Sequence, residues 1–430
     1  MARGGPGRRW RTLLLALAGA LVVAPALAAR IEVSEGDGHL AAALAAAAPG
    51  DEILLAPGVY RGPVRITRAV ILRGTSGAII DGQGSGRTVE VVAAGVTVRD
   101  IAIRNSGRNA ETMDAGIFLE AEAVGAVVEN NSITDCLVGI YVHGARDAMV
   151  RNNRIRGWTA PNLNDSGNGV YVWNAPGAQV IGNDISGGRD GIFSNTSRRN
   201  IFRDNRLHGV RFAVHYMYTN DSEVVGNVST GNHAGYVIMF SDHIAIRDNL
   251  SDGDRDHGFL FNYANGSEIT GNAVIHGGEK CVFIYNANKN RIVGNAFEGC
   301  RIGIHFTAGS ERNVIAGNAF IGNRTQVMYV GTRKLDWSWQ GRGNFWSDNP
   351  AFDLDGDGIA DSAYRPNDLT DQIVWRYPLA KLLLNSPAVQ LLRWAQAQFP
   401  NLHPGGVIDS APLMRPPAVA ALQRLQGADR

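Results

Sequence analysis

The sequence predicts an all-β fold, a right-handed parallel β-helix solenoid of about a dozen coils of 22 or 23 residues. An asparagine recurs at that spacing, with one interval of 30 that we interpret as 22 plus an eight-residue insertion. A second position, most often Gly, recurs in step with it, and each repeat has two short runs of β-forming residues. The recurring asparagines are Asn131, Asn153, Asn183, Asn205, Asn227, Asn249, Asn272, Asn295 and Asn318.

Each repeat is interpreted as one closed coil. Such short runs leave no room for the helix of a βαβ crossover, and they lack the two-residue turns of antiparallel hairpins. Stacked coils place identical residues about 4.8 Å apart, so the asparagines should form a hydrogen-bonded ladder with a structural role. The second position is occupied by Gly116, Gly139, Gly169, Gly191, Ala213, Gly235, Gly258, Cys281, Gly303 and Gln326.

Residues 1–28 are expected to be a secretory signal peptide, with arginines, the apolar run Leu13 to Ala24 and a small-residue cleavage site. This segment holds four arginines and no acid, so the formal charge of +1 falls to about −3 without it. That balance does not suit a nucleic-acid partner. The sequence therefore predicts an exported protein.

The remainder divides into four parts. Residues 29–52 should cap the open end of the solenoid, with a helix from about His39 to Ala48. The coils should run over 53–330, and two insertions, Asn109 to Met113 and Thr159 to Asp165, enlarge loops on one side. A C-terminal segment over 331–415, with an Asp-rich loop and a helix near "NSPAVQLLRWAQAQF", and a disordered tail over 416–430 complete the expectation.

Three cysteines, Cys136, Cys281 and Cys300, occupy different positions of the repeat. Because no two of them stack directly, disulfides between them are not expected. Buried thiols are the simpler interpretation.

The Asp-rich loop has calcium-ligand spacing. Asp353, Asp355, Asp357 and Asp361 stand at loop positions 1, 3, 5 and 9, and the Ile359 carbonyl is available at position 7. Tyr364 stands where a bidentate carboxylate is usual. A structural calcium site and a plain Asp-Gly turn both stay open.

The strand after the repeated Gly presents an outward face. Its first and third residues are apolar and should point inward, so the second and fourth point out. Such an apolar stripe needs a cover, either the C-terminal segment or a partner protein, and Tyr141, Tyr171 and Phe193 are candidate partner contacts.

A possible copper(I) site lies within this face. His215 and Met217 share one strand, and Met239 is one coil above Met217. An imidazole and two thioethers suit copper(I) in an oxidising compartment, although ordinary packing is the alternative.

The turn before the same strand carries a charged cluster that would suit a polyuronate epimerase or lyase, in which basic groups neutralise a carboxylate and a base removes a proton. A solvated charged turn is the alternative. The cluster is Arg211, His233, Asp254, Asp256, His257, Glu279, Lys280 and Arg301.

Three segments, "RFAVHYMYTNDSEVVGN", "GNFWSDNPAFDLDGDGIADSAYRPND" and "VWRYPLAKLLLNSPAVQLLRWAQ", carry a resemblance to the NosD family, periplasmic maturation factors of nitrous oxide reductase. The resemblance covers essentially the whole mature chain. It implies a non-enzymatic role in assembling the copper-sulfur centre of that reductase, with an ABC-transporter ATPase and permease and a copper chaperone lipoprotein. It also implies association with the inner membrane through the permease, for which we expect Leu391, Leu392 and Trp394 to be the contact.

Overall fold

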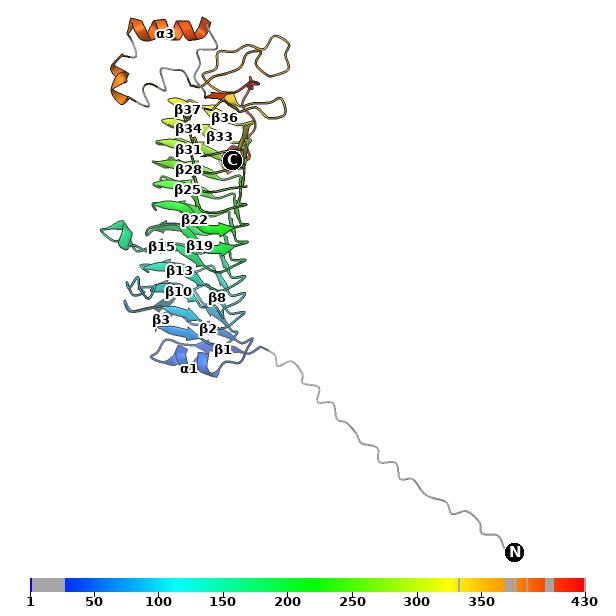
Figure 1. Cartoon of the computed structure of the whole chain (residues 1–430). Coiled ribbons are helices and arrows are strands. Elements are labelled where there is room, and N and C mark those ends of the chain that lie inside the picture. The colour runs from blue at the N-terminus through cyan, green and yellow to red at the C-terminus, as the bar shows by residue number, and fades with distance from the viewer. Residues whose placement is uncertain are drawn as a thin grey trace.

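The computed structural model describes residues 1, 28–331, 333–367, 373, 377–383, 386–398 and 406–428. The predicted signal peptide therefore lies almost entirely outside the described residues. The chain forms one long rod of stacked coils, with α1 at one end and α3 beyond the other (Figure 1). The predicted parallel β-helix is confirmed.

Three parallel sheets run along the rod, and each coil contributes one short strand to each of them. Strands of sheet A are β1 (Arg30–Val33), β2 (Glu52–Leu55), β5 (Ile71–Gly74), β8 (Thr97–Arg99), β11 (Val127–Glu129), β14 (Met149–Arg151), β17 (Gln179–Ile181), β20 (Ile201–Arg203), β23 (Glu223–Val225), β26 (Ala245–Arg247), β29 (Glu268–Thr270), β32 (Arg291–Val293) and β35 (Val314–Ala316).

Sheet B is built in the same way from the strands that follow. They are β3 (Gly58–Arg61), β6 (Ala78–Asp81), β9 (Ala102–Arg104), β12 (Ser132–Thr134), β15 (Arg154–Gly157), β18 (Asp184–Gly187), β21 (Arg206–His208), β24 (Val228–Thr230), β27 (Leu250–Asp252), β30 (Ala273–Ile275), β33 (Ala296–Glu298), β36 (Ala319–Ile321) and β39 (Phe345–Trp346).

Sheet C has the longest strands and carries the predicted outward face. It comprises β4 (Val64–Ile66), β7 (Val89–Val91), β10 (Ala115–Leu119), β13 (Val138–His143), β16 (Val170–Trp173), β19 (Ile192–Arg198), β22 (Phe212–Asn220), β25 (Ala234–Met239), β28 (His257–Asn262), β31 (Lys280–Tyr285), β34 (Ile302–Thr307) and β37 (Thr325–Val330).

The asparagine ladder is confirmed and forms the spine of the rod. Asn227 Nδ2 donates to the Phe202 carbonyl at 2.9 Å and to Asn249 Oδ1 of the next coil at 3.0 Å. Its own Oδ1 accepts from the backbone and side-chain amides of Asn205. The ladder continues one rung beyond Asn318, because Asn318 donates to Asn344 Oδ1 at 2.9 Å.

Both ends of the solenoid differ from the expected boundaries. β1 pairs with β2, so the stack begins inside the segment that we assigned to the cap, and β39 extends sheet B past Val330. The cap helix α1 spans His39–Ala46, ends before Pro49, and buries Leu40, Ala43 and Leu44.

The C-terminal region is more ordered than expected. η2 spans Pro378–Leu383 and the predicted helix is α3, Pro387–Gln398. The two-stranded pair β38 (Leu335–Asp336) and β40 (Val407–Ile408) joins the start and end of the segment. A third helix, α4 (Ala420–Ala428), replaces the expected disordered tail. It folds there because Val419 and Ala421 are buried against a flat strip of Leu250, Ala273, Ala296 and Ala319 on sheet B.

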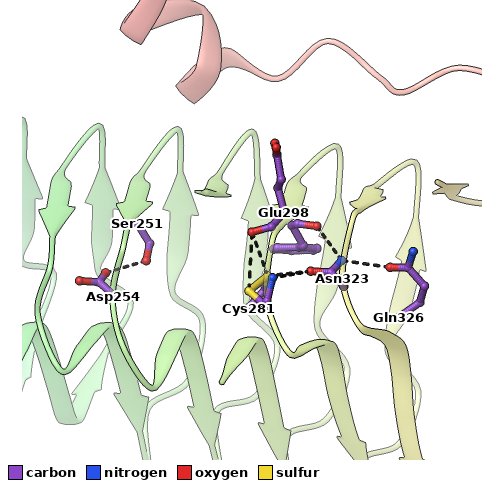
Figure 2. The surroundings of a disulfide bond; sticks show 8 residues. Ser251, Asp254, Cys281, Glu298, Asn323 and Gln326 are labelled. Carbon is purple, nitrogen blue, oxygen red and sulfur yellow. Dashed lines mark hydrogen bonds between the residues drawn. A yellow bond between two sulfur atoms is a disulfide. The ribbon is translucent and has the colours of Figure 1, made fainter. Parts of the chain in front are cut away.

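A disulfide between Cys281 and Cys300 corrects the expectation of free thiols, with Cα atoms 5.6 Å apart. The two residues occupy different positions of the repeat and do not stack directly. Cys281 lies on sheet C and Cys300 follows a strand of sheet B in the next coil, and both side chains are buried in the core. The disulfide therefore runs diagonally between adjacent coils. Gly277 leaves the space, since a Cβ there would lie 2.1 Å from Cys300 Sγ. Figure 2 shows Cys281 beside Asn323 in this interior corner.

The third cysteine, Cys136, is a buried thiol, as the simpler interpretation predicted. Burial raises its pKa to about 11, so the thiol stays protonated at neutral pH.

Removing one rung should destabilise the whole rod. In Asn227→Ala, the amide of Asn205 and the carbonyl of Phe202 lose buried partners, at about 1–3 kcal/mol for each unsatisfied group. We expect a clearly lower melting temperature by circular dichroism. Asn164→Ala, in the exposed loop helix η1 (Leu163–Asp165), is the matched control and should melt like the parent. Equal melting temperatures of the two variants would contradict a stabilising role of the asparagine ladder.

Candidate functional site

The outer face of sheet C is a continuous row of registered side chains. Strand pairing aligns each outward residue with its equivalent one coil away, as the sequence predicted. The row runs Phe118, Tyr141, Tyr171, Phe193, His215, Val237, Leu260, Phe283, His305 and Met328.

The cover of the first half of this row differs from both alternatives that the sequence left open. Its first half packs against the loops of the N-terminal half, with Leu137 buried in the same cluster and Met113 and Trp158 packed against it. Arg87 lies over the Phe118 ring at 3.4 Å. The described C-terminal segment instead covers part of sheet B through α4.

Tyr141, Tyr171 and Phe193 are therefore not available as partner contacts, which corrects that expectation. They stack face to face, with ring centroids 4.6 and 5.0 Å apart, and at most 8% of each residue is exposed. Because the three rings stack at the spacing of the coils, each is buried against the next.

His215 continues this stack and is hydrogen-bonded to an aspartate of the preceding coil. Its ring lies 4.7 Å from Phe193, and its Nδ1 is 3.1 Å from Asp190 Oδ2, one coil down. Arg211 donates two hydrogen bonds to the same carboxylate, from Nε to Oδ1 at 2.8 Å and from Nη2 to Oδ2 at 2.7 Å. The side chain of His215 is thus fixed in position and orientation.

The ionisation of Asp190 decides which nitrogen of His215 is free. Burial alone would raise the pKa of Asp190, but hydrogen bonds from His215 and Arg211 outweigh it and the pKa is lowered. The ionised carboxylate can only accept, so Nδ1 of His215 carries the proton. Nε2 is the ring nitrogen that Asp190 does not contact, and this buried atom has no hydrogen-bond partner among the described residues.

Met217 and Met239 lie on the same outer face of sheet C as His215. Met217 is two residues on from His215 along β22, and the register pairs Met217 with Met239 on β25. Both side chains are half-buried. Asn262 follows Met239 in the same row, and its buried Oδ1 is also without a partner among the described residues.

Asp190 was missed at the sequence level. It lies directly before Gly191, in the row that also holds Phe212 and Ala234, and contacts His215 diagonally across rows. Comparing only equivalent repeat positions cannot find a diagonal pair. The indication available in the sequence was an acidic residue directly before the repeated Gly.

The charged turn consists of one buried acid and of groups at the surface that partly pair with one another. Asp254 is buried and accepts hydrogen bonds from the hydroxyls of Ser229 and Ser251 at 2.6 Å. Four of the other groups form two pairs, His233 with Asp256 at 3.1 Å and Arg301 with Glu279 at 3.0 Å. These contacts favour the interpretation as a charged turn.

Comparison with known proteins identifies the family. Residues 158–351 match the family model described as "Periplasmic copper-binding protein (NosD)", a stretch that includes Asp190, His215, Met217 and Met239. A Pseudomonas aeruginosa protein named "Probable ABC transporter binding protein NosD" is 42% identical over 377 residues, covering 85% of this chain and 88% of that protein. This chain belongs to the NosD family.

One further similarity supports the family and another supports the fold. A NosD-family protein of Stutzerimonas stutzeri with the same name is 38% identical over 386 residues, covering 86% of this chain and 88% of that protein. Among solved structures, a mannuronic acid specific family 6 polysaccharide lyase from human gut microbiota superposes with a TM-score of 0.53 at 14% identity, covering 76% and 89% of the two chains. That likeness shows the β-helix fold alone.

The predicted transporter contact lies at the far end of the rod, on α3 (Figure 1). Leu391 is 65% exposed and Trp394 59%, while Leu392 is half-buried. Nearby Leu379 and Leu382 of η2 are more than 80% exposed. In the part of the chain that the structure describes, no helix is long and apolar enough to cross a membrane.

The Asp-rich loop is arranged as a compact carboxylate cluster. Oxygens of Asp353, Asp355 and Asp357 lie within 4.8 Å of one another. Backbone amides of the loop, first that of Gly358, hold the pKa of Asp353 below its usual value. Asp361 is not in this group and accepts from the Leu354 amide at 2.8 Å. Calcium binding by Asp353, Asp355, Asp357, the Ile359 carbonyl and Asp361 stays a prediction.

Calcium should raise the melting temperature of the protein if this loop binds it, because a ligand that binds only the folded state stabilises it by mass action. EGTA should reverse the shift, and Asp353→Asn combined with Asp355→Asn should abolish it. Asp165→Asn, an exposed acid of η1, is the control and should keep the response. Identical melting with calcium and with EGTA would contradict the site.

Proposed function

We propose that this chain is a periplasmic accessory protein that holds copper(I) on the outer face of sheet C for maturation of the copper-sulfur centre of nitrous oxide reductase. One observation carries the proposal: the buried Nε2 of His215 has no described partner while Asp190 holds Nδ1. The family description as periplasmic copper-binding supports it.

The donor set fits copper(I). His215 Nε2, Met217 Sδ and Met239 Sδ would hold the ion, since neutral imidazole and thioether are soft ligands that need no deprotonation. A carboxylate on the other ring nitrogen is the usual outer-shell support of a metal-binding histidine, because it fixes the tautomer and raises the basicity of the ligand. Copper(I) would be the cargo of this chain and not a resident cofactor.

The surroundings suit temporary binding. The Arg211 guanidinium compensates the charge of Asp190, so this ion pair adds little net charge beside the bound copper ion. His215 is buried, whereas Met217 and Met239 are half-buried and open the site on one side. A protein that carries ligands of its own can therefore approach from the methionine side and exchange the ion.

The partners in this proposal are a copper chaperone lipoprotein as donor, nitrous oxide reductase as recipient, and an ABC-transporter ATPase and permease. The names of the two relatives support the transporter association. We place the permease at α3, because a concentration of exposed apolar side chains at one end of a soluble rod marks a protein or membrane contact. Through this contact the chain would associate with the inner membrane.

No observation favours the alternative of a polyuronate-modifying enzyme. Its candidate base, Asp254, is buried and satisfied by two serine hydroxyls.

Copper(I) binding should depend on Asp190, which orients His215, as well as on the three proposed ligands. His215→Ala combined with Met217→Leu and Met239→Leu should lose binding in anaerobic competition with a chromogenic chelator. Asp190→Asn should weaken it by about 10- to 100-fold, as for other outer-shell changes.

His208→Ala and Met149→Leu are matched controls for the copper experiment. His208 also faces a carboxylate, Asp184 at 3.4 Å, but is exposed, and Met149 lies on sheet A. Both controls should bind like the parent. Unchanged affinity in the triple variant would exclude the site.

Trp394→Ser combined with Leu391→Ser should abolish co-purification with the permease, because it removes exposed apolar area without touching the rod. Point substitution is preferable to truncation after Ser386, which would also remove α4 and its packing on sheet B. Tyr285→Ser, which removes an exposed ring from β31, is the control. Retained co-purification of the α3 variant would place the contact elsewhere.

The maturation role itself is tested on the reductase. Nitrous oxide reductase produced without this chain should lack the absorption spectrum of its copper-sulfur centre, and the parent chain should restore it. A fully assembled centre in the absence of the chain would end the proposal.

A further inference from the structure

A second cluster of ionisable groups surrounds Phe283 on the same outer face. The His305 ring stacks on Phe283 at 4.7 Å, His257 lies 5.5 Å from it, and Lys280 Nζ is 4.4 Å above the ring centroid. The three polar groups come from β28, β31 and β34, so three consecutive coils build the cluster.

The cluster has nitrogen groups but no acid of its own. In the described part of the chain no carboxylate lies within ion-pair distance of Lys280. The nearest acids along the turn are engaged elsewhere, Asp256 with His233 and Glu279 with Arg301. Lys280 therefore has no ion-pair partner of its own among the described residues: burial lowers its pKa and outweighs the charges of Asp256 and Glu279, which raise it.

The two imidazoles are neutral and poorly satisfied. Burial, followed by the charge of Lys280, lowers the pKa of both His257 and His305 to about 4. Nδ1 of His305 is a buried atom without a hydrogen-bond partner among the described residues. Burial lowers the pKa of Lys280 as well. Each shift reports a group that water and counter-charges stabilise too little.

We propose that His257, Lys280 and His305 form a binding site for a small anion. A metal cation would meet the ammonium group of Lys280 at close range, and the resulting repulsion makes a cation the wrong ligand for these imidazoles. An anion would pair with Lys280 and accept hydrogen bonds from ring N–H groups, which satisfies all three side chains together. All three are partly exposed, so a small ion can enter.

This site is distinct from the proposed copper site. Val237, Leu260 and Phe283 separate His305 from His215 along the row. Its existence does not depend on the proposed function, and copper(I) binding should be unaffected by substitutions in it.

The test is a titration of the full mature chain with sodium sulfate, sodium acetate and sodium hydrosulfide at constant ionic strength, followed by NMR of the histidine rings. Binding should be saturable for at least one anion and should raise the pKa of His257 and His305, because an anion favours the imidazolium form. The three salts distinguish an oxyanion, a carboxylate and a sulfur anion.

Lys280→Gln should weaken binding about tenfold or more, since it removes the charged partner. His305→Phe should also weaken it while keeping the ring stack on Phe283. Lys289→Gln, an exposed lysine away from the cluster, is the control. Melting temperatures close to the parent would show that the variants fold. Absence of saturable binding for all three salts, or equal affinity in Lys280→Gln and Lys289→Gln, would overturn the proposal.

Discussion

The hydrogen bond between asparagines of successive coils is the interaction on which the structure depends, because every rung requires the next. Each Asn Oδ1 accepts from the coil before it, so the last rung, Asn344, needs an acceptor that the repeat no longer supplies. Asp409 supplies it, 2.7 Å from the Asn344 amide, and also binds Trp346 Nε1. A Cβ at Gly343 would lie 1.7 Å from this carboxylate, so glycine permits the approach. The C-terminal segment is therefore tied to the rod by the requirement of the ladder itself.

The same register that aligns the asparagines arranges the outer face of sheet C. Since equivalent residues lie one above the other, aromatic rings there must stack, and the stack from Tyr141 to Phe193 ends on His215. A side chain in such a stack has little rotational freedom, so little entropy is lost when it binds a ligand. Loops of the N-terminal half then pack on the first half of the row, as far as Phe193.

Periodic features could be predicted from the sequence, and non-periodic contacts could not. The coils, the ladder and the outward positions of His215, Met217 and Met239 all follow from spacing. The Cys281–Cys300 disulfide and the Asp190 contact run diagonally between different repeat positions, which a comparison of equivalent positions overlooks. Asn344 follows Asn318 after a longer interval than 23 residues, and α4 is stabilised by a strip of small residues whose flatness appears only after folding.

The copper and anion sites that we propose would give two histidines of one row opposite ligand preferences. His215 and His305 each stack on a phenylalanine of the coil below at 4.7 Å, so their packing is alike. Their charges differ: Asp190 lies 3.1 Å from His215, while Lys280 lies over the ring on which His305 stacks. A neighbouring carboxylate makes the free nitrogen of an imidazole a better donor to a cation, whereas an ammonium group without an ion-pair partner repels a cation and attracts an anion. If both proposals hold, the ligand preference of a histidine in this repeat is set by single residues in the row beside it, because the ladder fixes the shape of the coils.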